Sequence, residues 1–204
     1  MGEGEKEPLF PHLYMRIVSG SAGGLHLKVP KGHKVRPTAD QVREAIFNIL
    51  ASRFSLADVV VLDLFAGTGA LGIEALSRGA RSAIFVDASP DAQRVIRENL
   101  DLTNLRRHGR IIRAYAAKGI KVVEELELRF GGVFLDPPYG EGWVDKILRL
   151  LAQSPILEPG AWVVAEHGQG EKGAEAYPFL ALTDRRRYGT TGVSFYQRQN
   201  KEIV

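Results

Sequence analysis

From residue 59 onwards, short continuous apolar runs alternate with segments in which apolar residues recur at helical spacing. The runs predict strands that are buried on both faces, as in a parallel sheet, and the spaced segments predict helices. The expected strands are residues 59–64, 82–86, 110–113, 132–135 and 161–165. The expected helices between them are residues 70–78, 90–102, 118–129 and 143–153.

Two further extended segments, residues 181–187 and 193–197, are joined by Tyr188-Gly189-Thr190-Thr191-Gly192, which suits an antiparallel hairpin. The repeated strand–helix units predict an α/β fold with a doubly wound, mostly parallel Rossmann-like sheet. A closing hairpin in place of a sixth strand–helix unit departs from the plan of dinucleotide-binding dehydrogenases.

The chain ahead of the predicted sheet has a different pattern. Residues 1–14 are acidic and contain proline, without the basic and apolar regions of a signal peptide, so we expect a disordered leader. Residues 16–19 and 25–29 alternate across a glycine-rich turn and predict a hairpin. A helix is expected to begin after Thr38 as its N-cap and to run to about residue 53. The expected divisions are a leader at 1–14, a hairpin and helix extension at 15–55, and a main domain at 56–204.

Composition excludes several classes of protein. A chain of 204 residues fits one α/β domain, and no apolar run approaches the roughly 18 residues that span a bilayer. We therefore expect a cytoplasmic protein that makes no membrane contact. The complete absence of cysteine excludes disulfides, thiolate metal sites and cysteine nucleophiles.

Positive charge is unevenly placed, although the net charge is only +3. Lysine and arginine are frequent in residues 16–60 and again in residues 185–201. Two basic segments at opposite ends of the chain can converge into one phosphate-binding face. Solubilising surface charge is the other explanation, and the charge pattern alone does not decide between them.

Gly67, Gly69 and Gly72 form a G-x-G-x-x-G sequence between an expected strand and an expected helix. Such glycines permit a sharp turn and let a nucleotide approach the backbone without meeting a Cβ atom. For the glycines alone, a plain strand–helix turn is the alternative. Asp63 places a carboxylate at the tip of the strand, where a dinucleotide pyrophosphate would need a positive surface. A carboxylate there suits an ammonium group, such as the methionine end of S-adenosylmethionine.

Asp87 ends the second expected strand. An acidic side chain at that tip can accept hydrogen bonds from both ribose hydroxyls of a nucleoside. NAD and S-adenosylmethionine both carry this ribose, so Asp87 supports a nucleoside ligand without distinguishing the two. A capping role for the following helix is compatible with that interpretation.

Asp136-Pro137-Pro138-Tyr139 follows the fourth expected strand, and parallel strands would place it in the same crevice as the two aspartates. The prolines predict a rigid extended segment whose carbonyls have no internal partners. Methyl transfer to an exocyclic amine needs acceptors that hold both N–H groups and direct the nitrogen lone pair at the methyl group. The Asp136 side chain and the Pro137 carbonyl can supply them, and Tyr139 offers a ring for stacking a base. A strand ended by a Pro-Pro breaker is the alternative.

This combination predicts an S-adenosylmethionine-dependent methyltransferase acting on a base amino group. General base strength matters little in that reaction, because the proton can leave after the transfer. Methylation at C5 of a pyrimidine generally runs through a covalent cysteine adduct, which this chain cannot form.

Other polar residues carry less information. Glu166 and His167 end the fifth expected strand, where a polar pair is most often solvated. His26 and His33 lie among basic residues and suit contact with phosphate or solvent better than a metal. The sequence has no metal-ligand spacing and no G-x-S-x-G elbow, so we expect no metal.

Taken together, the motifs resemble the bacterial 16S ribosomal RNA guanine-N2 methyltransferase family of the RsmD type. The resemblance covers nearly everything after Met15. It is carried by residues 16–20, 36–50, 63–69, 136–139 and 187–196. The block at 36–50 is the most specific of these, since many methyltransferases share the others.

The resemblance implies a seven-stranded methyltransferase sheet and transfer to N2 of one guanine in 16S ribosomal RNA, within an assembled or assembling 30S subunit. The product would be S-adenosylhomocysteine, and we expect a monomer. A flipped guanine would stack on Tyr139, while the basic extension would grip phosphates. The family usually has an acidic residue after the third strand, where this chain has Ala114-Tyr115-Ala116-Ala117. Adenine recognition would then rest on a backbone N–H and packing.

The candidate residues follow from the motifs and from the resemblance. The catalytic candidates are Asp136, Pro137 and Tyr139. The cofactor candidates are Asp63, Phe65, Ala66, Gly67, Thr68, Gly69, Asp87, Ala88 and Ala116. The candidates for RNA contact are Arg16, Lys28, Lys34, Arg36, Thr38 and Arg43.

Three alternatives remain open on the sequence. A DNA adenine-N6 or cytosine-N4 methyltransferase would share the Asp136–Tyr139 motif, although such enzymes usually carry longer target-recognition regions. A nicotinamide oxidoreductase would use the glycine motif but needs a hydride-transfer site, which is not evident here. A catalytically silent RNA-binding assembly factor would keep the fold without the chemistry.

Overall fold

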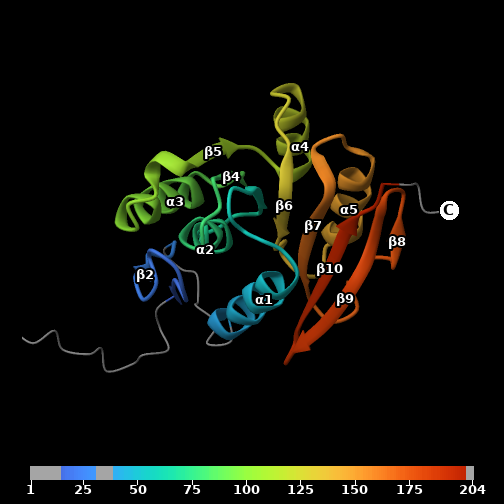
Figure 1. Cartoon of the computed structure of the whole chain (residues 1–204), viewed down its shortest axis with the longest axis horizontal. Helices are drawn as coiled ribbons and strands as arrows, with labels where there is room; N and C mark the ends of the chain where they lie inside the picture. Colours follow the sequence, from blue (N-terminus) through green and yellow to red (C-terminus); the bar gives the residue numbers. More distant parts are fainter. Residues whose placement is uncertain (1–14, 31–38, 201–204) are drawn as a thin grey trace, which may run out of the picture.

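One large sheet organises the protein, and the computed structural model describes residues 15–30 and 39–200 of it (Figure 1). Within these residues the large sheet has eight strands in the order β5-β4-β3-β6-β7-β10-β9-β8. The parallel strands are β3 (Val60–Leu64), β4 (Ser82–Asp87), β5 (Gly109–Arg113), β6 (Phe130–Leu135) and β7 (Leu157–His167). The antiparallel strands are β8 (Ala176–Tyr177), β9 (Leu180–Tyr188) and β10 (Thr191–Arg198). This confirms the predicted doubly wound sheet with a C-terminal hairpin, to which the two-residue β8 adds an eighth strand.

Helices cover both faces of the sheet (Figure 1). One face carries α1 (Ala39–Arg53), α2 (Ala70–Ser77) and α3 (Pro90–Leu102), and the other carries α4 (Ala116–Glu125) and α5 (Trp143–Gln153). A short 3-10 turn, η2 (Arg106–His108), precedes β5. Successive strand residues point to opposite faces, so Val61 packs with the first helix group and Leu62 with the second. The near-continuous apolar strands are therefore buried on both sides.

The helix ends are set by capping residues and backbone conformation, which the apolar pattern alone does not show. α3 begins as predicted, with Pro90 in its first turn and the Ser89 side chain accepting from the Ala92 N–H group at 3.3 Å. α4 ends at Glu125, earlier than the predicted residue 129, because Glu127 takes a left-handed φ of 54°. The N–H groups of residues 127 and 128 return to the carbonyls of residues 124 and 123, which closes the helix.

The predicted N-terminal hairpin is present but shorter than expected. β1 (Met15–Arg16) and β2 (His26–Leu27) pair antiparallel over two residues each. The N–H groups of Val18 and Ser19 donate to the carboxylate of Glu74 on α2, at 2.7 and 3.0 Å, instead of extending the strand pair. The hairpin therefore ends early because its backbone is bonded to the main fold.

Glu74 is fully buried and anchors this N-terminal hairpin. Besides Val18 and Ser19, its carboxylate receives the Arg78 Nε–H group at 2.7 Å and lies 3.7 Å from the Arg43 guanidinium of α1. Three elements distant in the sequence thus converge on one buried carboxylate.

Asn99 of α3 makes a second, uncharged link to the N-terminal hairpin. Its side-chain oxygen accepts from the Lys28 N–H group at 2.7 Å, and its amide donates to the carbonyls of Lys28 and Thr68 at 3.0 and 2.9 Å. The N-terminal hairpin therefore lies beside the glycine turn that contains Thr68.

None of the helices in the part of the chain that the structure describes is long and apolar enough to cross a membrane.

Replacing Glu74 by Gln should strongly destabilise the fold, since it leaves the buried Arg43 cation and the partly buried Arg78 cation without their shared carboxylate. Removing one partner of a buried ion pair costs about 3–5 kcal/mol. Urea unfolding at neutral pH measures the loss, with Glu44→Gln on the exposed side of α1 as the matched control. Equal unfolding free energies for the two variants would contradict this role of Glu74.

Candidate active site

The tips of three parallel strands meet at one edge of the sheet. Leu64 of β3 pairs in register with Val86 of β4 and with Leu135 of β6. Just beyond the strands, the Ala66 N–H group donates to the Val86 carbonyl at 3.2 Å, and the Asp136 N–H group donates to the Leu64 carbonyl at 3.4 Å. The residues that follow β3, β4 and β6 therefore lie in one crevice, as expected for the carboxyl ends of parallel strands.

The turn after β3 has an unusual backbone. Phe65, Gly67 and Gly69 take left-handed φ angles of 60°, 55° and 78°. Glycine adopts such angles without strain, whereas a phenylalanine there is held against its preference, a feature that concentrates at functional sites. At Gly72, an added Cβ would lie 2.4 Å from the Phe85 ring, so the turn needs glycine for close packing as well.

Asp87 connects this turn to the tip of β4. One carboxylate oxygen accepts from the Gly67 N–H group at 2.9 Å, and the other accepts from the Ser89 N–H group at 2.8 Å. The half-exposed Asp87 carboxylate also lines a cavity at the tips of these strands. Each oxygen retains a second lone pair, which can accept a further donor.

Asp63 lies behind the turn rather than in the cavity. Its side chain is 1% exposed, and Oδ2 accepts from the Gly72 N–H group at 2.9 Å. Burial raises the pKa of Asp63 to about 8, with the Gly72 hydrogen bond acting against the rise and the nearby Asp87 charge adding to it. The carboxyl group is therefore mostly protonated at neutral pH unless a cation approaches it.

A cavity of about 270 Å³ opens between the tips of β3, β4 and β5. It is lined by Phe65, Val86, Asp87, Ala88, Ser89, Ala114, Tyr115, Ala116, Pro138, Glu141 and Trp143. The Phe65 and Trp143 rings lie with their centroids 6.0 Å apart and their planes tilted by 56°. Aromatic and apolar walls with the Asp87 carboxylate among them suit a nucleoside, whose base is flat and whose ribose carries two hydroxyls. We call this hollow the nucleoside cavity.

The Asp136–Tyr139 segment forms the other wall of the crevice. Pro137 is buried, while Pro138 is exposed and reaches the nucleoside cavity. The Tyr139 hydroxyl donates to Glu166 Oε1 at 2.8 Å and lies 3.5 Å from Thr191 Oγ1. Burial, together with the Glu166 charge, raises the pKa of Tyr139 to about 12, so the phenol stays neutral.

A second hollow, of about 360 Å³, opens beside Tyr139. Its lining residues are Tyr139, Gly140, Gly168, Gln169, Glu171 and Thr190. Gly168 packs directly on the tyrosine ring, because an added Cβ would lie 3.2 Å from it. Both hollows are thus lined in part by the Asp136–Tyr139 segment, the first through Pro138 and the second through the Tyr139 ring.

The structure gathers most of the predicted cofactor candidates at this crevice. Phe65, Asp87, Ala88 and Ala116 line the nucleoside cavity itself. Gly67 is tied to Asp87, and the Gly69 N–H group closes the turn on the Ala66 carbonyl at 2.7 Å.

The RNA-contact candidates are divided. Arg16 and Lys28 are exposed on the N-terminal hairpin, where Lys28 pairs with Glu98 at 2.9 Å. Arg43 is 4% exposed, and its guanidinium donates to Asp40 and to the Arg16 carbonyl. This burial gives Arg43 a structural position and does not fit the phosphate contact predicted for it. Lys34, Arg36 and Thr38 lie outside the described residues, as does His33.

Two side chains at the end of β7, Glu166 and His167, make contacts that the sequence does not predict. Glu166 holds the Tyr139 hydroxyl, and His167 is 5% exposed instead of solvated. Burial lowers the pKa of His167, and its neutral ring donates to the Gly168 carbonyl from Nδ1 and accepts from Ser194 Oγ at Nε2. Glu166 bonds to the Asp136–Tyr139 loop and His167 bonds to Ser194 of β10. These partners are distant in the sequence, so no local pattern predicts the contacts.

Trp143 and Glu141 were also not anticipated. The Trp143 ring forms part of the cavity wall, and its N–H group donates to Glu141 at 2.7 Å. Among the described residues, no group of three or more His, Asp or Glu side chains is placed to hold a metal ion.

Comparison with known proteins agrees with the resemblance drawn from the sequence. The family model "Conserved hypothetical protein 95" matches residues 15–197. YlbH of Bacillus subtilis, named as a candidate rRNA methyltransferase, is 40% identical over 185 residues, covering 91% of this chain and 100% of that protein. Ribosomal RNA small subunit methyltransferase D of Escherichia coli is 32% identical over 186 residues, covering 91% of this chain and 90% of its own.

A solved structure of similar fold is that of yhhF from Escherichia coli, described as a candidate methyltransferase. It superposes with a TM-score of 0.75 at 30% identity and covers 91% of this chain and 98% of its own. The predicted methyltransferase fold is thereby confirmed.

The raised pKa of Asp63 should make stability depend on pH. An unfolded aspartate ionises near pH 3.8, whereas the folded group keeps its proton to about pH 8. The unfolded chain therefore binds fewer protons between these values, and the unfolding free energy falls as pH rises through them. Asp63→Asn removes this pH dependence, so its unfolding free energy relative to the wild type should rise from pH 4 to pH 8, by about 1 kcal/mol for each pH unit.

Urea unfolding at several pH values measures this difference. Asp58→Asn is the matched control, because Asp58 is exposed and its left-handed φ of 63° suits asparagine equally well. A parallel pH dependence for Asp63→Asn and Asp58→Asn would show that the Asp63 carboxyl group ionises normally in the folded protein.

Proposed function

The chain belongs to the conserved hypothetical protein 95 family, and on that premise we propose that it transfers a methyl group from S-adenosylmethionine to the exocyclic N2 amino group of a guanine in small-subunit ribosomal RNA. Its relatives carry the names of ribosomal RNA methyltransferases, which supports RNA as the substrate. Transfer to an amino group, and to guanine N2 in particular, is supported by the Asp136–Tyr139 segment and by the family resemblance.

The observation that carries the proposal is that the Asp136–Tyr139 segment borders two hollows. Pro138 lines the nucleoside cavity, and Tyr139 lines the second hollow. A donor in the first hollow and an amine in the second would both lie next to this segment. The loop is held from both ends, by the Leu64 carbonyl at Asp136 and by Glu166 at Tyr139.

The residues of the nucleoside cavity fit S-adenosylmethionine. We expect Asp87 to accept the ribose hydroxyls, while Ala88, Phe65 and Trp143 enclose the adenine. Ala116 opens α4, and the preceding residue makes no side-chain cap, so the first N–H groups of this helix can meet an adenine nitrogen. When bound, the cofactor supplies a methyl group activated by its sulfonium centre.

Asp63 has a supporting place in this proposal. It holds the glycine turn through Gly72 and sits in a buried position where an ammonium group in front of the turn would stabilise its ionised form.

On the target side, we expect the two N–H hydrogens of the amine to be accepted by the Asp136 carboxylate and the Pro137 carbonyl. Those bonds orient the nitrogen lone pair toward the methyl group, and a proton leaves the nitrogen after the new N–C bond has formed. Tyr139 is neutral and contributes its ring for stacking, with its hydroxyl fixed by Glu166. No strong base is required.

The polymer would approach over the N-terminal hairpin, which lies beside Thr68 of the glycine turn. Arg16 and Lys28 are exposed there and can meet phosphates. We propose that 16S RNA in an assembling or assembled 30S subunit is the substrate, and that a single copy of the chain suffices, since the crevice is built within one chain.

The test uses small ribosomal subunits from a strain that lacks the gene, incubated with the protein and labelled S-adenosylmethionine. Mass spectrometry of the digested RNA should find N2-methylguanosine. Asp136→Asn should lower kcat by about 10²–10³-fold, the cost of losing one positioned group at the reacting centre. Tyr139→Phe keeps the ring and should lose little, whereas Tyr139→Ala should lose much more.

The exposed Asp91→Asn, on α3, is the matched control and should keep full activity. Label in duplex DNA instead of RNA would replace the proposal by a DNA amino-methyltransferase. No label in either polymer, together with normal subunit assembly by Asp136→Asn, would favour a silent assembly factor.

Cofactor binding should release protons at pH 7. Asp63 is largely protonated at that pH, and an ammonium group brought near it favours the carboxylate. Calorimetric titration with S-adenosylhomocysteine in buffers of different ionisation enthalpy counts the released protons, and we expect up to about one. Asp63→Asn should bind without this release, while Asp58→Asn should behave as the wild type. Binding by the wild type with no proton exchange would remove Asp63 from the proposed set.

A further inference from the structure

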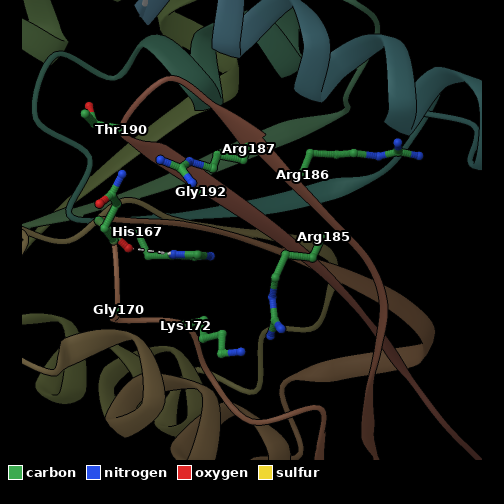
Figure 2. A pocket seen from close by; sticks show the side chains of 10 residues that line it. His167, Gly170, Lys172, Arg185, Arg186, Arg187, Thr190 and Gly192 are labelled. Carbon is green, nitrogen blue, oxygen red and sulfur yellow. Dashed lines mark hydrogen bonds between the residues drawn. The ribbon is translucent and has the colours of Figure 1, made fainter.

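A third pocket, of about 420 Å³, lies between the β9–β10 ribbon and the loop that follows β7 (Figure 2). Its lining residues are His167, Gly168, Gln169, Gly170, Lys172, Arg185, Arg186, Arg187, Thr190 and Gly192. It is separate from the nucleoside cavity, with which it shares no lining residue.

The pocket is strongly cationic. Lys172 and Arg185 extend into the same space from the loop and from β9, and Arg187 runs back toward the His167 side (Figure 2). None of the described residues that line it is acidic. Glu171 is adjacent in the chain, but its carboxylate turns to the N–H groups of Gly140 and Gly142, at 2.5 and 3.0 Å. Converging cations without a carboxylate among them create a positive potential that attracts an anion.

One wall of this cationic pocket is rigid. The Arg185 Nε–H group donates to Ser194 Oγ at 3.0 Å, and another guanidinium nitrogen donates to the Gly173 carbonyl at 3.0 Å. Ser194 in turn bonds to the buried ring of His167, which bonds to the Gly168 carbonyl. This chain of bonds connects β9, β10 and the loop after β7, so the cation at Arg185 is held in place without ligand.

Arg187 is different, since its Nε–H group donates only to the Gly189 carbonyl of its own turn, at 2.9 Å. Neither Arg187 nor Lys172 forms an ion pair with a described residue. These two side chains can therefore engage a ligand without breaking an internal contact to a carboxylate.

The cationic pocket adjoins the hollow beside Tyr139. Gly168, Gln169 and Thr190 line both. Gly168 also packs on the Tyr139 ring. A nucleotide whose base reached Tyr139 would carry its sugar and phosphates out of that hollow, and the nearest cations on this side are those of the cationic pocket.

We propose that the cationic pocket binds a backbone phosphate of the RNA next to the nucleotide that enters the crevice at Tyr139, through Arg187, Lys172 and Arg185. The inference rests on the proposed function and adds a specific contact to it. Guanidinium groups suit phosphate because they offer paired donors in a plane. Phosphate contacts of this kind fix the register of the nucleic acid without reading its sequence.

Arg187→Gln and Lys172→Gln test the proposal, assayed on unmethylated small ribosomal subunits. Each change should raise KM for the subunit about tenfold, the loss expected for one charge-assisted contact, and leave kcat within about twofold. In a plot of the logarithm of the subunit-binding constant against the logarithm of the salt concentration, the magnitude of the slope should decrease by about one for each phosphate contact removed. Binding of S-adenosylhomocysteine should not change.

Arg186→Gln is the matched control. Arg186 also borders the pocket and is the neighbour of the tested Arg187 on β9, but its side chain points the opposite way (Figure 2) and pairs with Asp184 at 3.1 Å, so the proposed contact does not use it. Asp184 keeps Arg53 as a partner at 2.6 Å when Arg186 is changed, so no carboxylate is left unpaired.

If Arg187→Gln and Lys172→Gln match Arg186→Gln in KM and in salt slope while the wild type methylates RNA, the pocket proposal fails and the proposed function stands. If the wild type methylates no RNA, the proposed function itself fails. Measuring the binding of each variant to protein-free small-subunit RNA at low salt distinguishes an RNA contact from a contact with a ribosomal protein. Weaker binding to subunits with unchanged binding to that RNA would assign the pocket to a ribosomal protein and overturn the RNA contact.

Discussion

The parallel pairing of β3 with β4 and β6 is the constraint on which the crevice depends. In-register pairing of Leu64 with both neighbours brings three strand tips to one edge of the sheet. The carboxyl groups of Asp63 and Asp87 then fix the glycine turn by accepting hydrogen bonds from the Gly72 and Gly67 N–H groups. Backbone donors that would otherwise need water are satisfied by side chains from the strands, which lets the turn approach the sheet closely.

The C-terminal hairpin completes the other half of the crevice. Tyr139 follows β6, yet its hydroxyl is bonded to Glu166 of β7 and lies near Thr191 of β10, and its ring packs on Gly168. The antiparallel strands therefore do more than close the sheet. They position the ring that we propose stacks the target base, and they carry the cationic pocket beside it.

The N-terminal extension is joined to this arrangement through buried polar contacts as well as through the apolar core, to which Ile17, Leu27 and Phe47 contribute. Glu74 and Asn99 are both fully buried, and between them they bond the hairpin to α2, α3 and the glycine turn. Buried polar groups of this kind are costly unless fully paired, so they specify one docking position. A basic hairpin is thereby held beside the crevice, where RNA would arrive.

Apolar periodicity and glycine or proline turns are local signals, so the sequence alone was enough to predict a doubly wound parallel sheet, the succession of strands and helices along the chain and the edge at which Asp87 and Asp136 lie. It did not determine the end of α4, where Glu127 adopts a left-handed angle, or the burial of Arg43. Nor did it reveal that Glu166 and His167 are engaged rather than solvated. The end of α4 is closed by backbone bonds to residues 123 and 124, whereas the burial of Arg43 depends on the distant Glu74 and that of His167 on the distant Ser194. Which distant groups form hydrogen bonds and ion pairs with one another depends on the folded structure, since a side chain's partner is set by proximity in space and not in sequence.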